Sequence, residues 1–325
     1  MMSNKTLLWM PVHNEEQFIA KAIESILAQS HTHFGLLISD NYSTDSTPTI
    51  IKEYAQKDPR IFIIKPPEFM PAMAHNAWLM SDCLSKLNFK YSCLVGGHDI
   101  MEVDYLKELF STAEQNTDCA IAYGRTICIN ELDDEMYEHK VFINDSSDIL
   151  LALRPLVILT SIGFNVYMAG LWREEFRKKI PKMHVCTASD HLLITEMAIQ
   201  GKFIFTDPAK FYLREIQKNT GGGNYLKRHL GSLDQGAKQD FATQLRWASD
   251  IVERACNMHP KHPLLGQPVL SSMIQSATLS AYIIRYLQPV GFHEDGIGQL
   301  FQDDLFKEIV ASNLRTEAAV KAFCG

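Results

Sequence analysis

Three short polar clusters in the first hundred residues contain the side chains best suited to chemistry. They are residues 11–15 (PVHNE), 40–45 (DNYSTD) and 96–99 (GGHD). Each cluster directly follows an apolar run, at the place where a buried strand would end. In a parallel α/β sheet, ligands collect in the crevice beyond the carboxyl ends of the strands. One such cluster is ordinary because loops are polar, but three on one edge of one sheet predict a binding site.

The elements that would position these clusters alternate between strand and helix patterns. Short apolar runs predict strands, and apolar residues at helical spacing predict helices. The predicted strands are 6–12, 34–39, 60–65, 91–95, 120–129 and 202–206, and the predicted helices begin near Glu15 and at 48–56, 73–87, 105–114 and 191–200. Residues 131–140 are acidic and predict a solvated loop or hairpin. This order predicts an α/β fold with a mostly parallel sheet flanked by helices.

Composition limits the function classes. The chain has 325 residues and a formal net charge of −7, which argues against a nucleic-acid partner because such proteins usually present a basic face. Its seven cysteines are scattered and form no C-x-x-C pair, so neither a disulfide framework nor a zinc ribbon is predicted. Several of them lie in apolar runs as small core residues, which fits a reducing compartment.

The apolar segments of the chain bear on its compartment and on its C-terminal region. The apolar stretch at 7–12 is too short for a signal-peptide core or a membrane span, and no segment reaches about 18 uncharged apolar residues. A cytoplasmic protein is predicted, with a peripheral contact at the inner face of the membrane left open. Helical spacing at 241–258, 268–287 and 303–323 predicts a helical C-terminal region, which packs either against the core or against a second subunit in a homodimer.

The first half of the chain resembles family 2 glycosyltransferases, which have a GT-A fold. The resemblance rests on P-V-H-N-E after the first strand, on S-I-L-A-Q-S at the end of the first helix, and on D-N-Y-S-T-D-S-T after the second strand. It is strong over about residues 1–110 and weaker to about 215. It implies a glycosyltransferase domain at 1–225, with nucleotide-sugar binding in 1–110 and the acceptor and catalytic part in 111–225, followed by the helical region 226–325.

The resemblance also implies the activity of an inverting glycosyltransferase of the hexosyltransferase type. Such an enzyme moves a sugar from a nucleotide-diphosphate donor, most simply a UDP-sugar, to a saccharide or lipid-linked acceptor. Synthesis of a surface polysaccharide or lipooligosaccharide is the implied setting. Two alternatives remain. One is a nucleotidyltransferase, although such an enzyme would normally have a glycine-rich phosphate loop after the first strand. The second is a non-catalytic homologue that binds a sugar nucleotide.

Carried over residue by residue, the resemblance assigns the donor site. Asp40 would accept a hydrogen bond from the imide-type edge of the base, a role suited to a carboxylate. The loop from Pro11 to Glu15, including His13, would lie over the base and ribose, with Glu15 as its polar contact. Asn41 replaces the second aspartate of the family's pair and keeps an acceptor.

Two further positions belong to the donor side. His75-Asn76 occupies the place of the family's A-R-N segment, where a cation commonly approaches the diphosphate. Histidine there would make the contact weaker and dependent on pH. Asp45 is either a donor contact or, more simply, a residue that begins the next helix.

The metal site departs most from the family pattern. The D-x-D motif is replaced by Gly96-Gly97-His98, followed by Asp99. His98 takes the ligand position, and a shift of one residue would make Asp99 the ligand. A divalent ion, Mn²⁺ or Mg²⁺, is predicted, and imidazole favours Mn²⁺. Gly97 would allow the backbone to pass close to the donor sugar, unless the glycine pair is only a tight turn.

The catalytic base is assigned to Asp190. It opens the predicted helix at 191–200 in a segment resembling the family's base motif, and Tyr212-Leu213-Arg214 matches the Y-R that follows. An inverting transfer needs a base that takes the proton of the acceptor hydroxyl. Alternatively Asp190 only caps the helix, and His191 is a rival base. Trp172 either stacks on a sugar or lies in the core.

Overall fold

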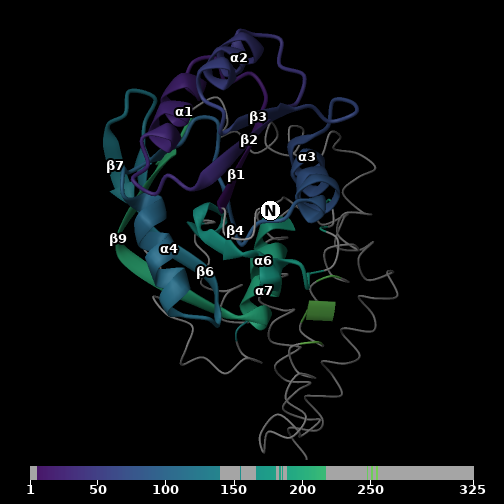
Figure 1. The fold of residues 1–325 in the computed structure, drawn as a ribbon, viewed down its shortest axis with the longest axis vertical. Helices are drawn as coiled ribbons and strands as arrows, with labels where there is room; N and C mark the ends of the chain where they lie inside the picture. Colours follow the sequence, from purple (N-terminus) through teal and green to yellow (C-terminus); the bar gives the residue numbers. More distant parts are fainter. Residues whose placement is uncertain are drawn as a thin grey trace, which may run out of the picture.

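The structure, a computed structural model, describes residues 6–139, 154, 166–180, 183, 185, 189–216, 247, 250, 251 and 254. Within them, helices cover both faces of one curved sheet (Figure 1). The strand order is β3-β2-β1-β4-β8-β6-β9-β5, and β7 pairs with β6 outside this path.

The N-terminal half of the sheet is parallel, as the strand and helix spacing predicts. Its strands are β1 (Thr6–Val12), β2 (Phe34–Asp40), β3 (Ile61–Ile64) and β4 (Tyr91–Leu94), with β1 paired to both β2 and β4. The connecting helices are α1 (Ile19–Leu27), α2 (Thr47–Lys57) and α3 (Ala72–Trp78). Because these strands run in one direction, their carboxyl ends share one edge of the sheet.

The second half makes the sheet mixed. Its elements are β5 (Ile100–Met101), α4 (Tyr105–Gln115), β6 (Cys119–Ile129), β7 (Glu135–Glu138), β8 (Leu171–Arg173), α6 (Glu174–Arg177), α7 (Ser189–Gln200) and β9 (Lys202–Arg214). Strand β9 is parallel to β6, whereas β8 is antiparallel to both β4 and β6. The acidic stretch after β6 forms a hairpin through β7, one of the two forms predicted for it.

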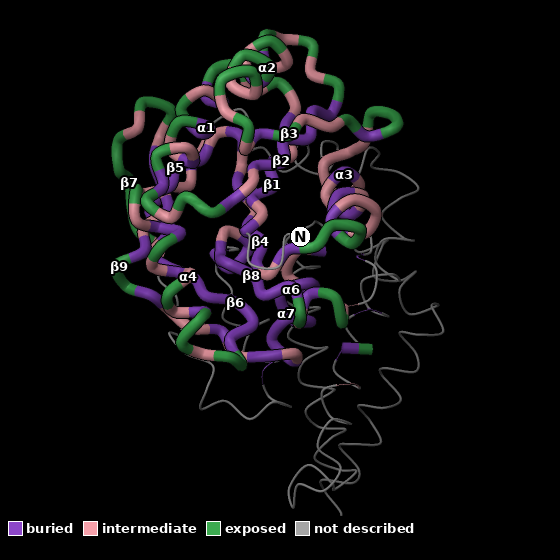
Figure 2. The backbone as a smooth tube through the Cα atoms, in the orientation of Figure 1, coloured by how far each residue is buried: buried purple, intermediate pink, exposed green. Residues whose placement is uncertain are grey.

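Side-chain alternation along the strands builds two separate cores. On β1, Leu8 and Met10 join the core beneath α1, α2 and α4, whereas Trp9 points to the opposite face and joins the core beneath α3 and α7. Successive residues of a strand point to opposite faces, so a run that is apolar throughout fits a strand covered on both sides. Figure 2 shows β1, β2, β4 and β6 as mostly buried, whereas β7 is exposed and α2 is mostly exposed or intermediate.

Two elements differ from the sequence prediction. The helix predicted at 73–87 is interrupted, because α3 is followed by a π-helical turn (Leu79–Cys83) and a 3-10 turn (Leu84–Lys86). The strand predicted at 202–206 continues to Arg214, since Pro208 lies in a bulge opposite β6 rather than ending the strand. Gly124 is needed there, because a Cβ would lie 2.2 Å from the carbonyl oxygen of Ala209.

Part of the predicted C-terminal helix packs against the core. Residues 247, 250, 251 and 254 are helical, and Trp247 and Ile251 are buried in the same core as α7. Trp247 Nε1 donates to Glu196 Oε1 of α7 at 2.9 Å, and Arg254 forms an ion pair with the same carboxylate. Residues 268–287 and 303–323, the proposed boundary at 225, and any dimer contact lie outside the described residues. Among the described helices, none combines the length and apolar character needed to cross a bilayer.

Candidate active site

The loops after β1 and β2 are joined by hydrogen bonds, as expected for neighbouring strand ends. His13 Nδ1 lies 2.8 Å from the carbonyl oxygen of Asn41. The backbone N–H of Asn14 donates to Ser43 Oγ at 2.9 Å, and Asn14 Oδ1 accepts from the N–H of Thr44 at 2.8 Å. Asn14 has a positive φ of 57°, a conformation that asparagine tolerates better than most residues. The first two polar clusters therefore form one surface.

The third cluster meets the first through Glu15 and His98. His98 Nδ1 lies 3.1 Å from both carboxylate oxygens of Glu15, and the N–H of Glu15 donates to Thr47 Oγ1 at 2.8 Å. Burial alone would lower the pKa of His98, but the charges of Asp99 and Glu15 outweigh burial and raise that pKa to about 9. All three clusters thus converge at one edge.

Asp40 is completely buried at the end of β2. Its Oδ1 accepts the N–H of Ser43 at 3.0 Å, and its Oδ2 lies 3.2 Å from Lys65 Nζ. The Lys65 contact is an ion pair without the angle of a hydrogen bond, so Oδ2 has no hydrogen-bond donor. Lys65 is half exposed and follows β3, a fourth strand end on the same edge that the sequence analysis did not use. The apolar run at 60–65 ends at Lys65, and this strand end was the sequence signal that could have identified the residue.

The segment before α3 is fastened to the end of β2. The side chain of Asn41 donates to the carbonyl of Met70 at 2.6 Å and accepts its N–H at 3.0 Å. Asn76 is half-buried on α3. His75 is 3% exposed, and its Nε2 lies 2.8 Å from Ser39 Oγ. Burial lowers the pKa of His75 to about 4, so the expected cationic contact with a diphosphate does not fit this neutral, inward-facing ring.

Asp45 is occupied by backbone donors at the start of α2. Its Oδ1 accepts the N–H of Thr47 at 3.0 Å and its Oδ2 accepts that of Glu16 at 3.1 Å. Asp45 was predicted either to contact the donor or to begin the next helix, and this geometry matches the second role.

Trp172 is 4% exposed and donates from Nε1 to the carbonyl of Tyr167 at 2.9 Å. It therefore lies in the core rather than on a sugar-binding surface.

In the His98–Asp99 turn, the imidazole of His98 faces Glu15 and the carboxylate of Asp99 faces backbone N–H groups. Asp99 is 5% exposed; its Oδ2 accepts the N–H of Gly96 at 3.2 Å and its Oδ1 that of Arg214 at 3.0 Å. His98 Nε2 lies 4.0 Å from Asp99 Oδ1. A carboxylate on one imidazole nitrogen commonly orients the other toward a metal, so Glu15 and His98 fit such a site. Asp99 could also be a ligand of such a metal site only if its Oδ1 bound the ion while still accepting the N–H of Arg214.

Gly97 is buried in the same turn for a packing reason. A Cβ at this position would lie 2.9 Å from Val12 Cγ1 and 3.1 Å from Glu15 Cγ. Contacts that short require β1 or the Glu15 side chain to shift. The glycine therefore lets the turn after β4 sit directly against the end of β1, which keeps His98 within reach of Glu15.

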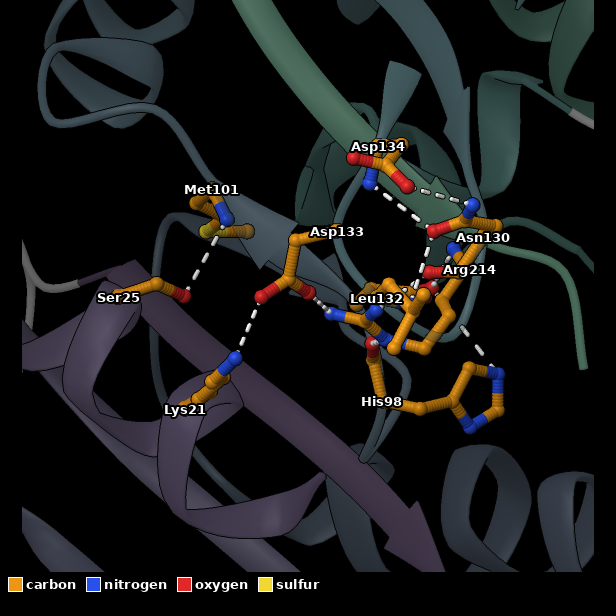
Figure 3. A network of polar contacts seen from close by, with 10 residues as sticks. Lys21, Ser25, His98, Met101, Asn130, Leu132, Asp133, Asp134 and Arg214 are labelled. Carbon is orange, nitrogen blue, oxygen red and sulfur yellow. Dashed lines mark hydrogen bonds and ion pairs between the residues drawn. The ribbon is translucent and has the colours of Figure 1, made fainter. Parts of the chain in front are cut away.

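Arg214, at the end of β9, holds this turn in place (Figure 3). Its side chain is fully buried, and it donates from Nε to the carbonyl of His98 at 2.9 Å and from Nη1 to that of Asn130 at 2.6 Å. Its Nη2 pairs with Asp133 in the β6–β7 turn, and Asp133 also pairs with Lys21 of α1. In the sequence, Arg214 stood out only as a match to the family, and Asp133 was not singled out. No spacing in the sequence signals this pair.

Asp190 lies in the first turn of α7. Its Oδ1 accepts the backbone N–H of His191 at 3.0 Å and lies 3.1 Å from His191 Nδ1. Both side chains are partly exposed, at 23% and 18%. Ser189 Oγ lies 3.2 Å from Met73 Sδ, so the start of α7 adjoins the start of α3, which Asn41 ties to β2 through Met70. This geometry leaves both the catalytic and the capping role of Asp190 possible.

The Glu15–His98 pair should make stability depend on pH when divalent ions are chelated. Because the folded-state pKa of about 9 exceeds the ordinary histidine pKa of 6.5, the stabilisation is complete below pH 6.5 and is lost as pH rises toward 9. We expect the melting temperature of the wild type to fall over this window more than that of His98→Gln, measured by scanning fluorimetry in chelator. Parallel curves for the two proteins would contradict the pairing.

Comparison with known proteins places this chain in a family. The sequence profile of glycosyl transferase family 2 matches residues 8–188, which is more than half of the chain. The chain therefore belongs to glycosyl transferase family 2, and the predicted resemblance is confirmed. The glycosyltransferase GlyA of Streptococcus pneumoniae is 27% identical over 140 residues, covering 43% of this chain and 19% of GlyA. The putative teichuronic acid biosynthesis glycosyltransferase TuaG of Bacillus subtilis is 25% identical over 113 residues, covering 35% and 43%.

Solved structures confirm the GT-A-like α/β fold. TarS 1–349 of S. aureus, in complex with UDP-GlcNAc, superimposes with a TM-score of 0.66 at 14% identity, covering 92% of this chain and 79% of that one. The mannosyltransferase PcManGT of Pyrobaculum calidifontis, in complex with GDP-Man and Mn²⁺, gives a TM-score of 0.51 at 12% identity, covering 97% and 87%. The chain matches less than half the length of GlyA and of TuaG, so these likenesses establish family and fold.

Proposed function

We propose that this chain is an inverting glycosyltransferase that transfers a sugar from a nucleotide-diphosphate donor. One observation carries the proposal: the loops after β1, β2 and β4 converge on a single edge of the sheet through His13, Glu15 and His98, in a chain whose family is that of glycosyl transferases. Ligands of open α/β sheets bind outside the carboxyl ends of the strands, which is where these three loops lie.

The base would bind at the end of β2. Asp40 Oδ2 lacks a hydrogen-bond donor, and the half-exposed Lys65 can move aside to let an imide N–H take that place. A UDP-sugar is the simplest donor with such an edge, and TarS was solved with UDP-GlcNAc. Pro11, His13 and Glu15 would contact the base and ribose, while Asn41 would act indirectly by fixing Met70.

The diphosphate would lie over the His98–Asp99 turn. His98, oriented by Glu15, would hold Mn²⁺ or Mg²⁺, with Asp99 as the neighbouring carboxylate. When bound, a divalent ion supplies charge neutralisation for the departing diphosphate. Arg214 keeps the turn rigid through the carbonyl of His98, and Gly97 lets the turn approach β1.

Asp190 would take the proton of the acceptor. The acceptor oxygen attacks the anomeric carbon, the bond from that carbon to the diphosphate oxygen breaks, and the hydroxyl proton passes to the Asp190 carboxylate. The acceptor we propose is a saccharide or a lipid-linked saccharide, in the synthesis of a surface polysaccharide. The relative TuaG of Bacillus subtilis, a putative teichuronic acid biosynthesis glycosyltransferase, favours this setting.

A donor screen tests the proposal. The full chain is melted with UDP-, GDP- and other nucleotide-sugars in the presence of Mn²⁺, because a ligand that binds the folded state raises the melting temperature. We expect one nucleotide class to stabilise the protein and to be hydrolysed slowly without acceptor. Stabilisation without any hydrolysis or transfer would favour a non-catalytic sugar-nucleotide binder, the second candidate, which the replacement of D-x-D by Gly96-Gly97-His98 suggests.

Removing the Asp40 carboxylate should weaken nucleotide binding. We expect Asp40→Ala to lower UDP affinity by about 1–3 kcal/mol, the usual cost of a lost charged hydrogen bond, measured by calorimetry. Lys65→Ala serves as the control, because it removes the ion-pair partner of Asp40 without removing the acceptor. Unchanged UDP affinity in a folded Asp40→Ala protein would remove Asp40 from the site.

A further inference from the structure

A cysteine, a histidine and a glutamate come together where β6, β7 and β9 meet, and no step of the proposed transfer uses them. Strand pairing places Cys128 opposite Tyr137 of β7 and Leu213 of β9. Paired residues share a face of the sheet, and so do residues two apart on one strand. His139 and Glu215, each two positions beyond those partners, therefore point to the face of Cys128.

The ligand atoms of these three residues are close enough to hold one metal ion. Cys128 Sγ lies 2.9 Å from His139 Nε2, and the sulfur, an imidazole nitrogen and a Glu215 carboxylate oxygen all lie within 4.8 Å of one another. Zinc binds sulfur at about 2.3 Å and nitrogen at about 2.0–2.1 Å, so a tetrahedral ion needs these two atoms about 3.6 Å apart. The required movement is a few tenths of an ångström for each side chain.

The surroundings favour a bound cation. The backbone continues the sheet past β7 and β9, since His139 N donates to the carbonyl of Thr126 and Glu215 N to that of Ile129, both at 2.9 Å. The hydroxyl of Tyr137 donates to Glu215 Oε1. Residues that hydrogen-bond to metal ligands commonly fix the ligands' orientation in this way. Cys128 is buried while His139 and Glu215 are partly exposed, which leaves a path for an ion.

We propose that Cys128, His139 and Glu215 form a zinc-binding site separate from the sugar-transfer site. A thiolate and a carboxylate would neutralise Zn²⁺, and the thiol proton is released to solvent as the Zn–S bond forms. Sulfur selects zinc over the hard ions Mg²⁺ and Mn²⁺, so the two sites would hold different metals. Three protein ligands leave a fourth position for water.

The site would stiffen one wall of the transfer site. Glu215 follows Arg214 directly, and the Arg214 N–H binds Asp99. Zinc would therefore tie the end of the β6–β7 hairpin to the end of β9, beside the turn that carries His98. Its predicted effect is on stability, and it does not depend on the proposed transfer.

Cobalt titration of the metal-free full chain tests the site, because a thiolate on tetrahedral Co²⁺ gives a sulfur-to-cobalt absorption band. We expect one equivalent to produce the band, Zn²⁺ to abolish it, and Zn²⁺ to raise the melting temperature. Cys128→Ser should lose the band, while Cys83→Ser and His98→Ala should keep it. Tyr137→Phe should keep the band but weaken the affinity about 10–100-fold, as expected for a partner of a metal ligand.

Two results would overturn the proposal. The wild type could give no sulfur-to-cobalt band, or the band could persist in Cys128→Ser. Either result would show that the cluster is only a hydrogen-bonded group. If Cys128→Ser does not fold, Glu215→Gln decides, because it removes a partly exposed ligand and keeps the buried thiol. It should weaken the affinity for Co²⁺, and an unchanged affinity in this variant would exclude the site.

Discussion

Replacing Asp190 with asparagine should lower kcat by about 10²–10⁴-fold, the contribution of a positioned general base. Asparagine keeps the shape of the side chain and an oxygen that can accept the His191 N–H, which Asp190 Oδ1 accepts at 3.0 Å in the wild type. What it loses is the ability to take a proton from the acceptor hydroxyl. The KM for the donor should stay close to that of the wild type, because only the acceptor side is altered.

The same variant distinguishes a base from a helix cap. Asparagine caps helices about as well as aspartate, so a purely capping residue would leave both kcat and the melting temperature near wild type. His191→Gln is the matched control, since His191 Nδ1 lies 3.1 Å from Asp190 and is the rival base. If kcat of Asp190→Asn falls less than about tenfold while that of His191→Gln collapses, the base is His191.

Removing divalent metal should lower turnover by about 100-fold or more, since metal stabilisation of a leaving group is worth several kcal/mol and each 1.36 kcal/mol is tenfold in rate. Activity should return better with Mn²⁺ than with Mg²⁺, because an imidazole ligand favours the softer ion. His98→Ala should raise the concentration of Mn²⁺ needed for half-maximal activity. Binding of Mn²⁺ in the presence of UDP, followed by electron paramagnetic resonance, should weaken in parallel.

His98→Asp is the informative companion. It places a carboxylate at the position that the resemblance aligns with the last aspartate of D-x-D. We therefore expect it to retain activity and to shift the preference toward Mg²⁺. Gly96→Ala is not a suitable control, because its Cβ would lie 2.4 Å from Asp99 Oδ2. Full activity of the wild type in chelator would contradict the metal role and would imply that cationic side chains stabilise the diphosphate.

Local pattern was sufficient for much of the fold. Strand β1 was predicted at its observed limits, and β2 and α4 to within one residue, because their apolar periodicity is long and uninterrupted. Prediction failed where tertiary contacts override local preference. Pro208 would end an isolated strand, yet the partner β6 accommodates it in a bulge made possible by Gly124. Helix α3 likewise gives way to a π-helical turn that no spacing signals.

The sequence by itself determined the family, the parallel half of the sheet and the edge on which the polar loops gather, because strand direction and loop position follow from the order of elements along the chain. Only the tertiary structure decided what each side chain faces. It turned His75 inward to Ser39, engaged Asp99 with the Arg214 backbone, and left His98 beside Glu15. It also brought Cys128 to His139 and Glu215. Such contacts depend on the pairing and packing of segments far apart in sequence, which spacing along the chain does not encode.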